Sequence, residues 1–194
     1  SSQHARLALI IMHRNQSYTS IEEIKSEINE TVKSFAPKDI KDMSKIPFLS
    51  LGTSDIGSRN VIFKATSGLS RDFIVEDVTV DDQIFRRLIF MNNQNVIQSE
   101  ARLKRLKKKV VVDHNDLSCQ HHVYLILGML ISENEGNLEN LVIGLGGGGL
   151  LTFIYHHLKD LKMTVVEIDP EIVKVAENYF DVVEDEKRLK VVVD

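Results

Sequence analysis

The chain has 194 residues, 43% of them hydrophobic and 27% charged, which is the composition of a globular protein with one or two domains. Its formal net charge of −4 at pH 7 argues against a protein that coats nucleic acid, because such proteins carry a basic excess. The single cysteine, Cys119, excludes an internal disulfide and favours a reducing compartment such as the cytoplasm, and no apolar run is long enough to span a membrane.

The N-terminal part of the chain predicts one strand and one helix. Residues 5–13, ARLALIIMH, form a short apolar run that predicts a buried strand. Residues 20–36 predict a helix, because apolar residues recur there every three or four positions and form one stripe. The stripe consists of Ile21, Ile24, Ile28, Val32 and Phe35. Ser20 and Glu23 have the spacing of a capping box at the start of this helix, and Pro37 lies just past its end.

The next part of the chain predicts a β-rich region. Short apolar segments predict strands over 47–52, 60–66 and 72–80. Two further segments, 84–90 and 96–103, are separated by the turn residues NNQN and predict a β-hairpin.

A basic run, RLKRLKKK, follows at 102–109, where six of eight residues are basic. We interpret this run as a solvated loop, because blocks of like charge repel one another and favour exposure. Contact with an acidic partner is the alternative interpretation.

From residue 117 onwards the pattern changes to alternating helices and strands. Residues 117–131 predict a helix with a broad apolar face. The following elements are strand 140–145, helix 148–159, strand 163–168, helix 170–180 and strand 188–193. Such alternation indicates a parallel sheet with right-handed crossovers. We therefore expect an α/β protein, with a small mixed β-rich lobe over 1–112 followed by the first half of a Rossmann-like domain over 113–194.

The glycine-rich turn after the strand at 140–145 is the strongest functional signal. Five of the six residues at 144–149 are glycines, which tolerate positive φ and let a ligand approach the backbone. Gly144, Gly146 and Gly149 match G-x-G-x-x-G between a strand and a helix. Glu167 follows 18 residues after Gly149, where a carboxylate can accept hydrogen bonds from both ribose hydroxyls. The pattern predicts a nucleoside-containing ligand, and the spacing leaves a dinucleotide and S-adenosylmethionine both open.

Other polar residues near this motif are assigned simpler roles. Asp169 directly precedes a proline and predicts a helix N-cap. Cys119, His121 and His122 cluster in the sequence, with His114 nearby, but their spacing matches no standard zinc pattern. We therefore expect no metal site. The sequence contains no G-x-S-x-G elbow, and its catalytic residues stay unassigned.

Several stretches taken together resemble one family. They are HARLALIIMHRNQSY, IPFLSLG, DIGSR, DFIVEDV, FRRLIFMNNQNVIQSEARL, CQHH, and LVIGLGGGGL with VEIDP. In this order, and across the whole chain, they resemble the C-terminal part of the methyltransferase-like protein 13 family, and FRRLIFMNNQNVIQSEAR is the most specific of them. The resemblance implies a class I methyltransferase, similar in fold to spermidine synthases. It would use S-adenosylmethionine to methylate the N-terminal α-amine of translation elongation factor 1-alpha.

The resemblance also implies a set of site residues. The cofactor would be held by Gly144, Gly146, Gly148 and Glu167. Similarity to spermidine synthases implies that Gln98, in NVIQS, touches the nucleoside, and Asp194 stands where the adenine contact begins. Gly147 occupies the place of an acid that spermidine synthases use, which speaks against aminopropyl transfer.

Several alternatives stay open on the sequence alone: an NAD-dependent oxidoreductase, a spermidine-synthase-like aminopropyltransferase, and a non-catalytic binding module. The family fold needs about seven strands in its sheet and only three fit before the last residue, so we expect a truncated Rossmann-like domain that is weak or inactive by itself. A strand at 188–193 would then form an exposed edge that can recruit another chain, and we expect that a homodimer can form.

Overall fold

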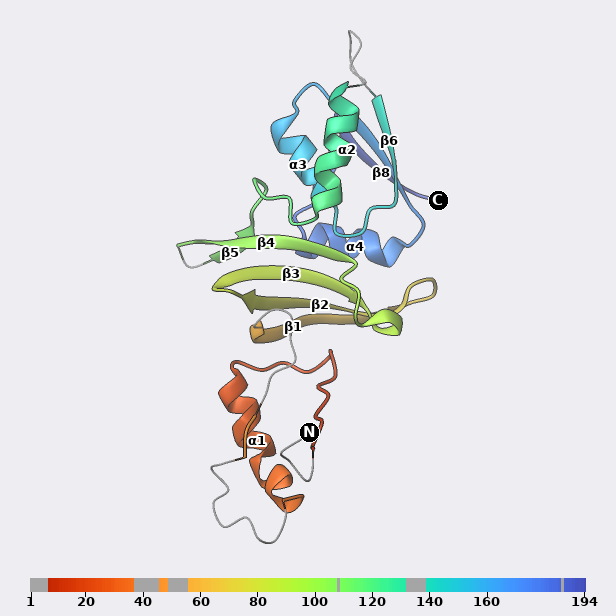
Figure 1. Ribbon diagram of the computed structural model, residues 1–194. Coiled ribbons are helices and arrows are strands. Elements are labelled where there is room, and N and C mark those ends of the chain that lie inside the picture. Colours follow the sequence, from red (N-terminus) through yellow and green to blue (C-terminus); the bar gives the residue numbers. More distant parts are fainter. Residues whose placement is uncertain (1–6, 37–45, 49–55, 108, 132–138, 186) are drawn as a thin grey trace.

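The computed structural model describes residues 7–36, 46–48, 56–107, 109–131, 139–185 and 187–194. Three parts follow one another along the length of the molecule (Figure 1): helix α1, a five-stranded antiparallel sheet, and a three-stranded parallel sheet with its helices. The fold is α/β, as the sequence predicts, with a β-rich part before a Rossmann-like one. None of the helices in the described ranges combines the length and the apolar character needed to cross a membrane.

The antiparallel sheet has its strands in chain order. They are β1 (Ile56–Ser67), β2 (Arg71–Val80), β3 (Gln83–Phe90), β4 (Ser99–Leu106) and β5 (Lys109–Val112). Phe73, Val75 and Leu88 are buried on one face, where they pack against Ile172 and Phe180 from the region of α4. Figure 1 shows α4 lying between the two sheets. The antiparallel sheet and α4 therefore share a hydrophobic core.

The predicted strands at 60–66 and 72–80 and the hairpin of 84–90 with 96–103 are confirmed. The hairpin connection contains a short 3-10 helix, η2 (Met91–Asn93), and β4 begins at Ser99, three residues later than predicted. Of the segment 47–52, residues 47–48 are not in a strand and the remainder lies outside the described residues.

The prediction of a loop at 102–109 is wrong, whereas the predicted solvent exposure is confirmed at Arg105, Lys107 and Lys109. β4 runs through this segment to Leu106, and β5 begins at Lys109. Ala101 and Leu103 point into the core, while Lys104 faces outward and forms a 2.8 Å ion pair with Asp113. The alternation of inward and outward side chains that identifies a strand is hard to recognise here, because the outward positions Arg102 and Lys104 make the segment look like a run of basic residues.

Helix α1 spans Ile21–Ser34, as predicted, and Ser20 caps it by accepting a 3.1 Å hydrogen bond from the Glu23 N–H. The capping box differs in one detail, because the Glu23 carboxylate accepts from the backbone N–H and the hydroxyl of Thr19, one residue before the cap. No residue of α1 is fully buried, and Phe35, at its end, is 61% exposed. The apolar stripe therefore contributes little to the core formed by the described residues.

The prediction of a buried strand at 5–13 is wrong for its described part. Residues 7–13 are not in a strand, and Leu7 and Ile11 are 93% and 83% exposed. A strand needs a run of backbone partners. Within the described ranges this N-terminal segment meets β1 as an isolated bridge, in which Tyr18 and Arg59 exchange hydrogen bonds of 2.7 and 2.8 Å.

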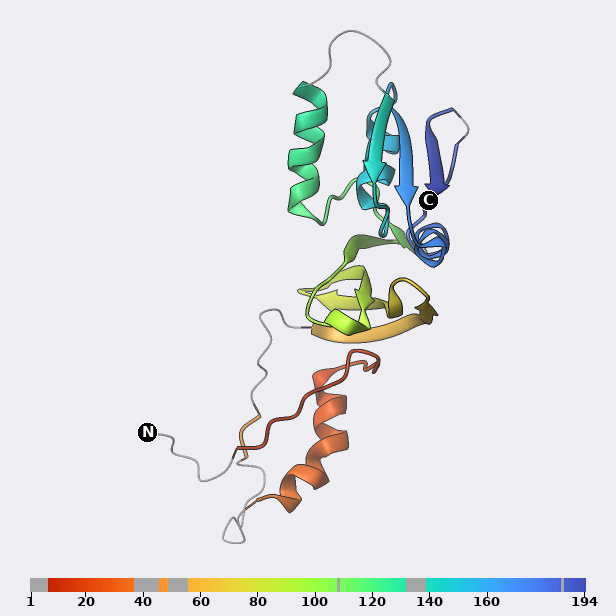
Figure 2. The ribbon, with the colours of Figure 1, turned by 90° about the vertical axis from the view of Figure 1, so that its right-hand side faces the viewer.

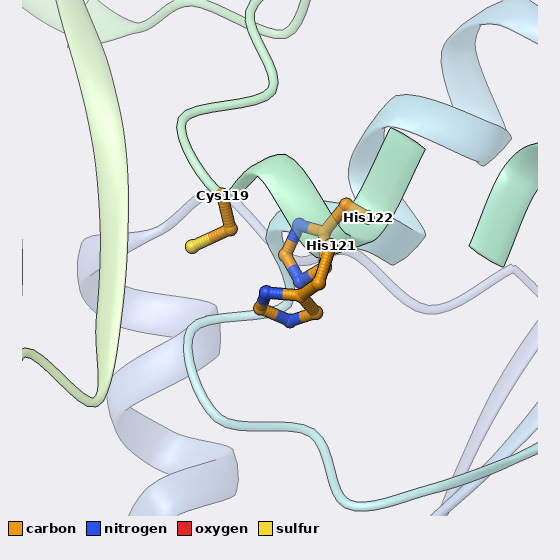
Figure 3. A group of neighbouring side chains, drawn as sticks. All are labelled: Cys119, His121 and His122. Atoms are coloured by element: carbon orange, nitrogen blue, oxygen red, sulfur yellow. The ribbon is translucent and has the colours of Figure 1, made fainter. Parts of the chain in front are cut away.

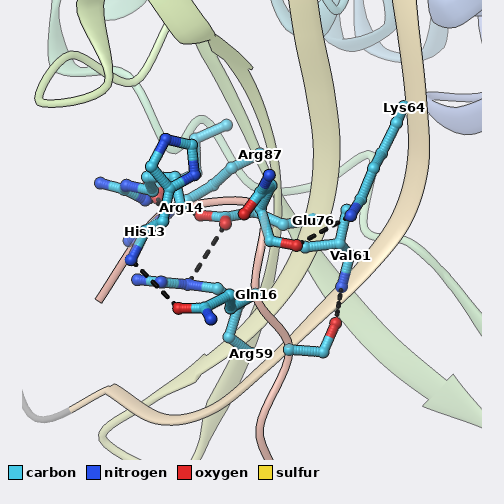
Figure 4. Close-up of polar contacts among 11 residues, drawn as sticks. His13, Arg14, Gln16, Arg59, Val61, Lys64, Glu76 and Arg87 are labelled. Carbon is cyan, nitrogen blue, oxygen red and sulfur yellow. Dashed lines mark hydrogen bonds and ion pairs between the residues drawn. The ribbon is translucent and has the colours of Figure 1, made fainter.

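Side-chain contacts also hold residues 13–18 against the antiparallel sheet (Figure 4). The Arg14 guanidinium lies 2.6 Å from the carboxylate of Glu76, whose side chain is fully buried in the middle of β2, and Arg59 approaches the other oxygen at 3.3 Å. The Lys64 ammonium donates to the Asn15 carbonyl at 2.8 Å. The segment is thus fastened to β1 and β2 mainly through charged and polar groups.

The C-terminal part alternates helices and strands as predicted. Its elements are α2 (Gln120–Ile131), β6 (Glu139–Ile143), α3 (Gly149–His157), β7 (Lys162–Glu167), α4 (Pro170–Tyr179) and β8 (Leu189–Val193). The strands are parallel in the order β6-β7-β8 (Figure 2). Leu151 and Ile154 of α3 pack with Val165 of β7 and Ala176 of α4 in one buried cluster. The predicted loop at 133–137 lies outside the described residues.

Asp169 joins the antiparallel sheet to α4. Its Oδ1 accepts a 3.0 Å hydrogen bond from the Glu171 N–H, which confirms the predicted N-cap of α4. Its Oδ2 accepts from the hydroxyls of Ser67 (2.6 Å) and Ser70 (2.5 Å), which flank the turn between β1 and β2. The residue is 1% exposed. Burial raises the pKa of this carboxyl, but the hydrogen bonds from Ser67, Ser70 and Glu171 outweigh burial and lower the pKa overall.

We expect Asp169→Ala to lower the free energy of unfolding by about 3 kcal/mol, the combined order of magnitude of a lost N-cap and lost hydrogen bonds to a charged acceptor. Urea unfolding measures this loss. Glu171→Ala is the matched control, because this half-buried neighbour, within the described residues, pairs with Lys174 of the same helix and should change stability little. Equal effects of the two substitutions would contradict the joining role of Asp169.

The contribution of Asp169 should also depend on pH with a defined sign. Because its pKa is lower in the folded chain than in the unfolded chain, the stabilisation is complete above the unfolded pKa and is lost as the pH falls through the folded value. The stability difference between the unmodified chain and Asp169→Ala should therefore shrink in acid.

Candidate functional site

The glycine turn joins β6 to α3 in the geometry that the sequence predicts. Gly144, Gly146 and Gly148 have φ values of +86°, +55° and +70°. An L-residue adopts this left-handed region at a cost of about 1–2 kcal/mol, so glycine is the natural residue at all three positions. The Gly148 residue is the N-cap of α3, and the unpaired N–H groups of the first helical turn begin here.

Three of the glycines also leave room for neighbouring side chains. A Cβ atom on Gly146 would lie 2.7 Å from the Ser99 hydroxyl oxygen, and one on Gly148 would overlap a methyl group of Val182. A Cβ on Gly147 would lie 3.0 Å from the Phe180 ring. The bare backbone of the turn therefore allows close packing from the start of β4 and from the end of α4.

Ser99 connects the turn to the antiparallel sheet directly. Its hydroxyl accepts a 2.8 Å hydrogen bond from the Gly147 N–H and donates a short one to the side-chain carbonyl of Gln98. The Gln98 side chain thereby lies beside the glycine turn, where a Cβ on Gly146 would be 3.0 Å from its Nε2. The structure brings Gln98 and the glycines together, and the contact of Gln98 with a nucleoside stays a prediction.

Glu167 fixes the turn from the end of β7. Its side chain accepts hydrogen bonds from the Leu145 N–H (2.8 Å) and the Asp169 N–H (3.0 Å), and the residue is only 8% exposed. Each carboxylate oxygen keeps a second lone pair that a ribose hydroxyl could use. The ribose contact stays a prediction. What the structure adds is a role in holding the turn.

Asp194 lies at the same edge of the parallel sheet. Its N–H donates to the Glu167 carbonyl at 3.2 Å, and the residue is exposed. Gly144 and Asp194 thus follow the carboxyl ends of β6 and β8, and Glu167 is the last residue of β7. Open α/β sheets bind their ligands outside these strand ends.

A cavity of about 210 Å³ opens beside the glycine turn. Of the predicted site residues its wall includes Gln98, Gly144 and Gly148, whereas Gly146, Glu167 and Asp194 do not line it. Drug-sized ligands usually occupy pockets of about 300–1,000 Å³, so this cavity is smaller than a typical ligand pocket.

The wall also contains residues to which the sequence assigned no binding role. These are Ser99, Glu100, Cys119, His121, His122 and Phe180. Ser99 adjoins Gln98 in the segment NVIQS, which is the one sequence signal that could have identified it. Phe180 lies at the end of α4, and nothing in the local sequence indicates that its ring reaches the turn.

Cys119, His121 and His122 come together at the start of α2 (Figure 3). One ligand atom from each lies within 4.8 Å of the other two. Burial lowers the pKa of His122 to about 4, helped by the neighbouring His121, and burial raises the pKa of the Cys119 thiol. At neutral pH the His122 imidazole and the Cys119 thiol are therefore both uncharged.

No protein-family model matches the chain. It is 40% identical over 205 residues to the eEF1A lysine and N-terminal methyltransferase homolog of Drosophila melanogaster, an alignment that covers 100% of this chain and 30% of the relative. The eEF1A lysine and N-terminal methyltransferase of Xenopus laevis is 40% identical over 216 residues, covering 96% and 31%. That of Homo sapiens is 37% identical over 212 residues, covering 93% and 30%. The chain thus spans about 30% of the length of these relatives.

Two solved structures show weaker overall likeness. Human methyltransferase-like protein 13, in complex with SAH, is 36% identical with a TM-score of 0.37, and the match covers 39% of this chain and 36% of that one. Spermidine synthase from Thermotoga maritima is 18% identical with a TM-score of 0.44, covering 69% and 40%. Both TM-scores are below 0.5, so neither structural likeness supports an argument about this chain.

The glycine turn gives a graded stability prediction. We expect Gly144→Ala to cost about 1–2 kcal/mol, because its φ is unfavourable for alanine but a Cβ there would meet no atom within 4 Å. Gly148→Ala should cost clearly more, because the new Cβ would also collide with Val182. Chemical unfolding of the two variants measures the difference. A Gly148→Ala chain as stable as Gly144→Ala would show that the packing around the turn is loose.

Proposed function

We infer that this chain is part of an S-adenosylmethionine-dependent methyltransferase of the eEF1A lysine and N-terminal methyltransferase family. The observation that carries this inference is the 40% identity to the Drosophila melanogaster relative over the full length of the chain. The glycine turn supports it independently. It presents bare backbone and a helix N-terminus at the strand ends where α/β folds bind nucleosides.

We propose that the cofactor lies between the lobe of residues 1–112 and the Rossmann-like lobe of residues 113–194. Its methionine part would follow the glycine turn at Gly144, Gly146 and Gly148, and Gln98 would close the site from the β-rich lobe. Glu167 would accept from the ribose with its remaining lone pairs, while Asp194 marks the direction of the adenine. The known contacts that support this arrangement are those that hold Gln98 and Glu167 against the turn.

The proposed acceptor is the N-terminal α-amine of eEF1A. Methyl transfer is an in-line displacement at the sulfonium methyl, in which the amine nitrogen forms a bond to carbon as the carbon–sulfur bond breaks and S-adenosylhomocysteine leaves. The protein contributes mainly by positioning the two reactants. The amine must be neutral to attack. An α-amine, with a pKa of about 7.7–8.0, meets this condition far more easily than a lysine at about 10.4.

We further propose that the protein acts in the cytoplasm and can form a homodimer, without direct binding to nucleic acid. The single cysteine suits a reducing compartment, and the net charge of −4 gives no general attraction to phosphate backbones. Equilibrium sedimentation of the chain measures its oligomeric state.

The cofactor site is tested by titration calorimetry with S-adenosylhomocysteine, which removes any need for turnover. We expect Gln98→Ala and Glu167→Ala each to weaken binding by about tenfold or more, the effect of losing roughly one hydrogen bond to a nucleoside. Gln94→Ala is the matched control, because Gln94 lies in the same connection between β3 and β4 but contacts His13 and does not line the cavity. Unchanged affinity in both site variants would rule out this arrangement, and binding of NAD in place of S-adenosylhomocysteine would favour the oxidoreductase.

The acceptor is tested by the pH dependence of methylation by the protein that contains this chain. With an N-terminal peptide of eEF1A as acceptor, the rate should rise with pH and level off above about 8, because an α-amine loses its proton at about 7.7–8.0. Mass spectrometry locates the methyl groups. The same peptide with an acetylated N-terminus is the control and should not react. Methylation confined to lysine side chains would contradict the proposed acceptor.

A further inference from the structure

Three side chains with metal-binding atoms share one wall of the cavity. Cys119 directly precedes α2, and His121 and His122 lie in its first turn, so the start of this helix holds all three close together (Figure 3). Their ligand atoms lie within 4.8 Å of one another, and within the described part of the chain they are the one group of this kind. We propose that Cys119, His121 and His122 bind a single zinc ion.

The ligand chemistry suits zinc. This ion binds thiolate sulfur at about 2.3 Å and imidazole nitrogen at about 2.0–2.1 Å in a tetrahedral arrangement, so its ligand atoms stand roughly 3.5 Å apart. The present separations are all within 4.8 Å, so zinc binding would require the three side chains to rotate toward a common point. The sequence spacing C-x-H-H matched no standard zinc pattern, and it is the helix start that brings the ligands together.

Zinc binding at these three side chains has a defined proton balance. A neutral imidazole ring offers one nitrogen lone pair to a metal without losing a proton. The Cys119 pKa is raised by burial, although the Glu100 N–H donates to its sulfur. Zinc must therefore displace the thiol proton, forming a Zn–S bond and releasing one H⁺ to solvent. Affinity should rise with pH for this reason.

The three proposed ligands line the cavity, so an ion there would take its fourth ligand from the cavity side. Among the described residues no further histidine, cysteine, aspartate or glutamate belongs to the group, and nearby Glu100 is engaged by Arg87 at 2.5 Å. A water molecule or a pocket ligand would complete the tetrahedron, as in zinc sites with three protein ligands. The His122 ring also lies 3.8 Å from where a Cβ on Gly149 would stand, so the ion would lie close to the glycine turn. If the proposed function is correct, the dication and the positively charged cofactor would compete for this space.

The test is a zinc titration of the reduced chain in the absence of any cofactor, with a chromophoric chelator as competitor. We expect one zinc per chain and release of about one proton. Cys119→Ser and His122→Ala should each weaken zinc binding by more than about 100-fold, beyond the 10–100-fold loss seen when groups that merely orient metal ligands are removed. His13→Ala is the matched control, because it deletes an exposed imidazole at a distance from the cavity and should leave affinity unchanged.

Cobalt provides a readout that does not depend on affinity alone. The cobalt-loaded chain should show a thiolate-to-cobalt charge-transfer band in the near ultraviolet, and this band should be absent from Cys119→Ser while circular dichroism shows that the variant is folded. Lack of saturable zinc binding, or a charge-transfer band that persists in Cys119→Ser, would overturn the proposal. Because the titration contains no cofactor, its outcome is independent of S-adenosylhomocysteine binding, which the calorimetry of the proposed cofactor site measures separately.

Discussion

The architecture of the site depends on a backbone turn that carries no side chains where its neighbours press closest. At Gly146, Gly147 and Gly148 the space that a Cβ would need is taken by Ser99 from one lobe and by Phe180 and Val182 from the other. The absence of side chains at these glycines therefore allows neighbouring side chains to pack against the turn, in addition to leaving the backbone accessible to a ligand. Since the Ser99 hydroxyl also accepts a hydrogen bond from the Gly147 N–H, the β-rich lobe is joined to the glycine turn at the point where the cavity opens.

The segment VEIDP contains two acidic residues, Glu167 and Asp169, which form different sets of hydrogen bonds. Glu167 accepts from the Leu145 N–H and sets the conformation of the turn, while Asp169 caps α4 and binds the two serines at the β1–β2 connection. Both carboxylates are almost completely buried. Buried carboxylates are stable only when their oxygens accept several hydrogen bonds, and both meet that requirement. The local sequence thus orders the site and also fixes the two lobes against each other.

Much of this arrangement could be predicted from the sequence because it is encoded locally. The positive φ angles at Gly144, Gly146 and Gly148, the parallel strands and the cap at Asp169 all follow from neighbouring residues. Contacts between distant segments could not be predicted in this way. The approach of Phe180 to the turn, the convergence of Cys119 with the two histidines, and the pairing of β4 with β5 beneath a basic run each require the folded chain. The prediction of a buried strand at 5–13 was wrong in its described part for a different reason. An apolar run becomes buried only if another surface covers it, and residues 7–13 are largely exposed.

The ion pair between Arg14 and Glu76 connects the N-terminal segment to β2 and contributes to the stability of the antiparallel sheet. The Glu76 carboxylate is wholly enclosed in β2, 62 residues from the Arg14 guanidinium that meets it. Removing one partner of such an enclosed ion pair commonly costs about 3–5 kcal/mol, although Arg59 would still lie 3.3 Å away. A protease that cut between residues 14 and 18 would therefore do more than shorten a tail. If Arg14 were lost, the buried Glu76 carboxylate would keep only Arg59 of the two guanidinium groups that now pair with it. Cleavage in this N-terminal segment would then destabilise the β-rich lobe that carries Gln98 and Ser99.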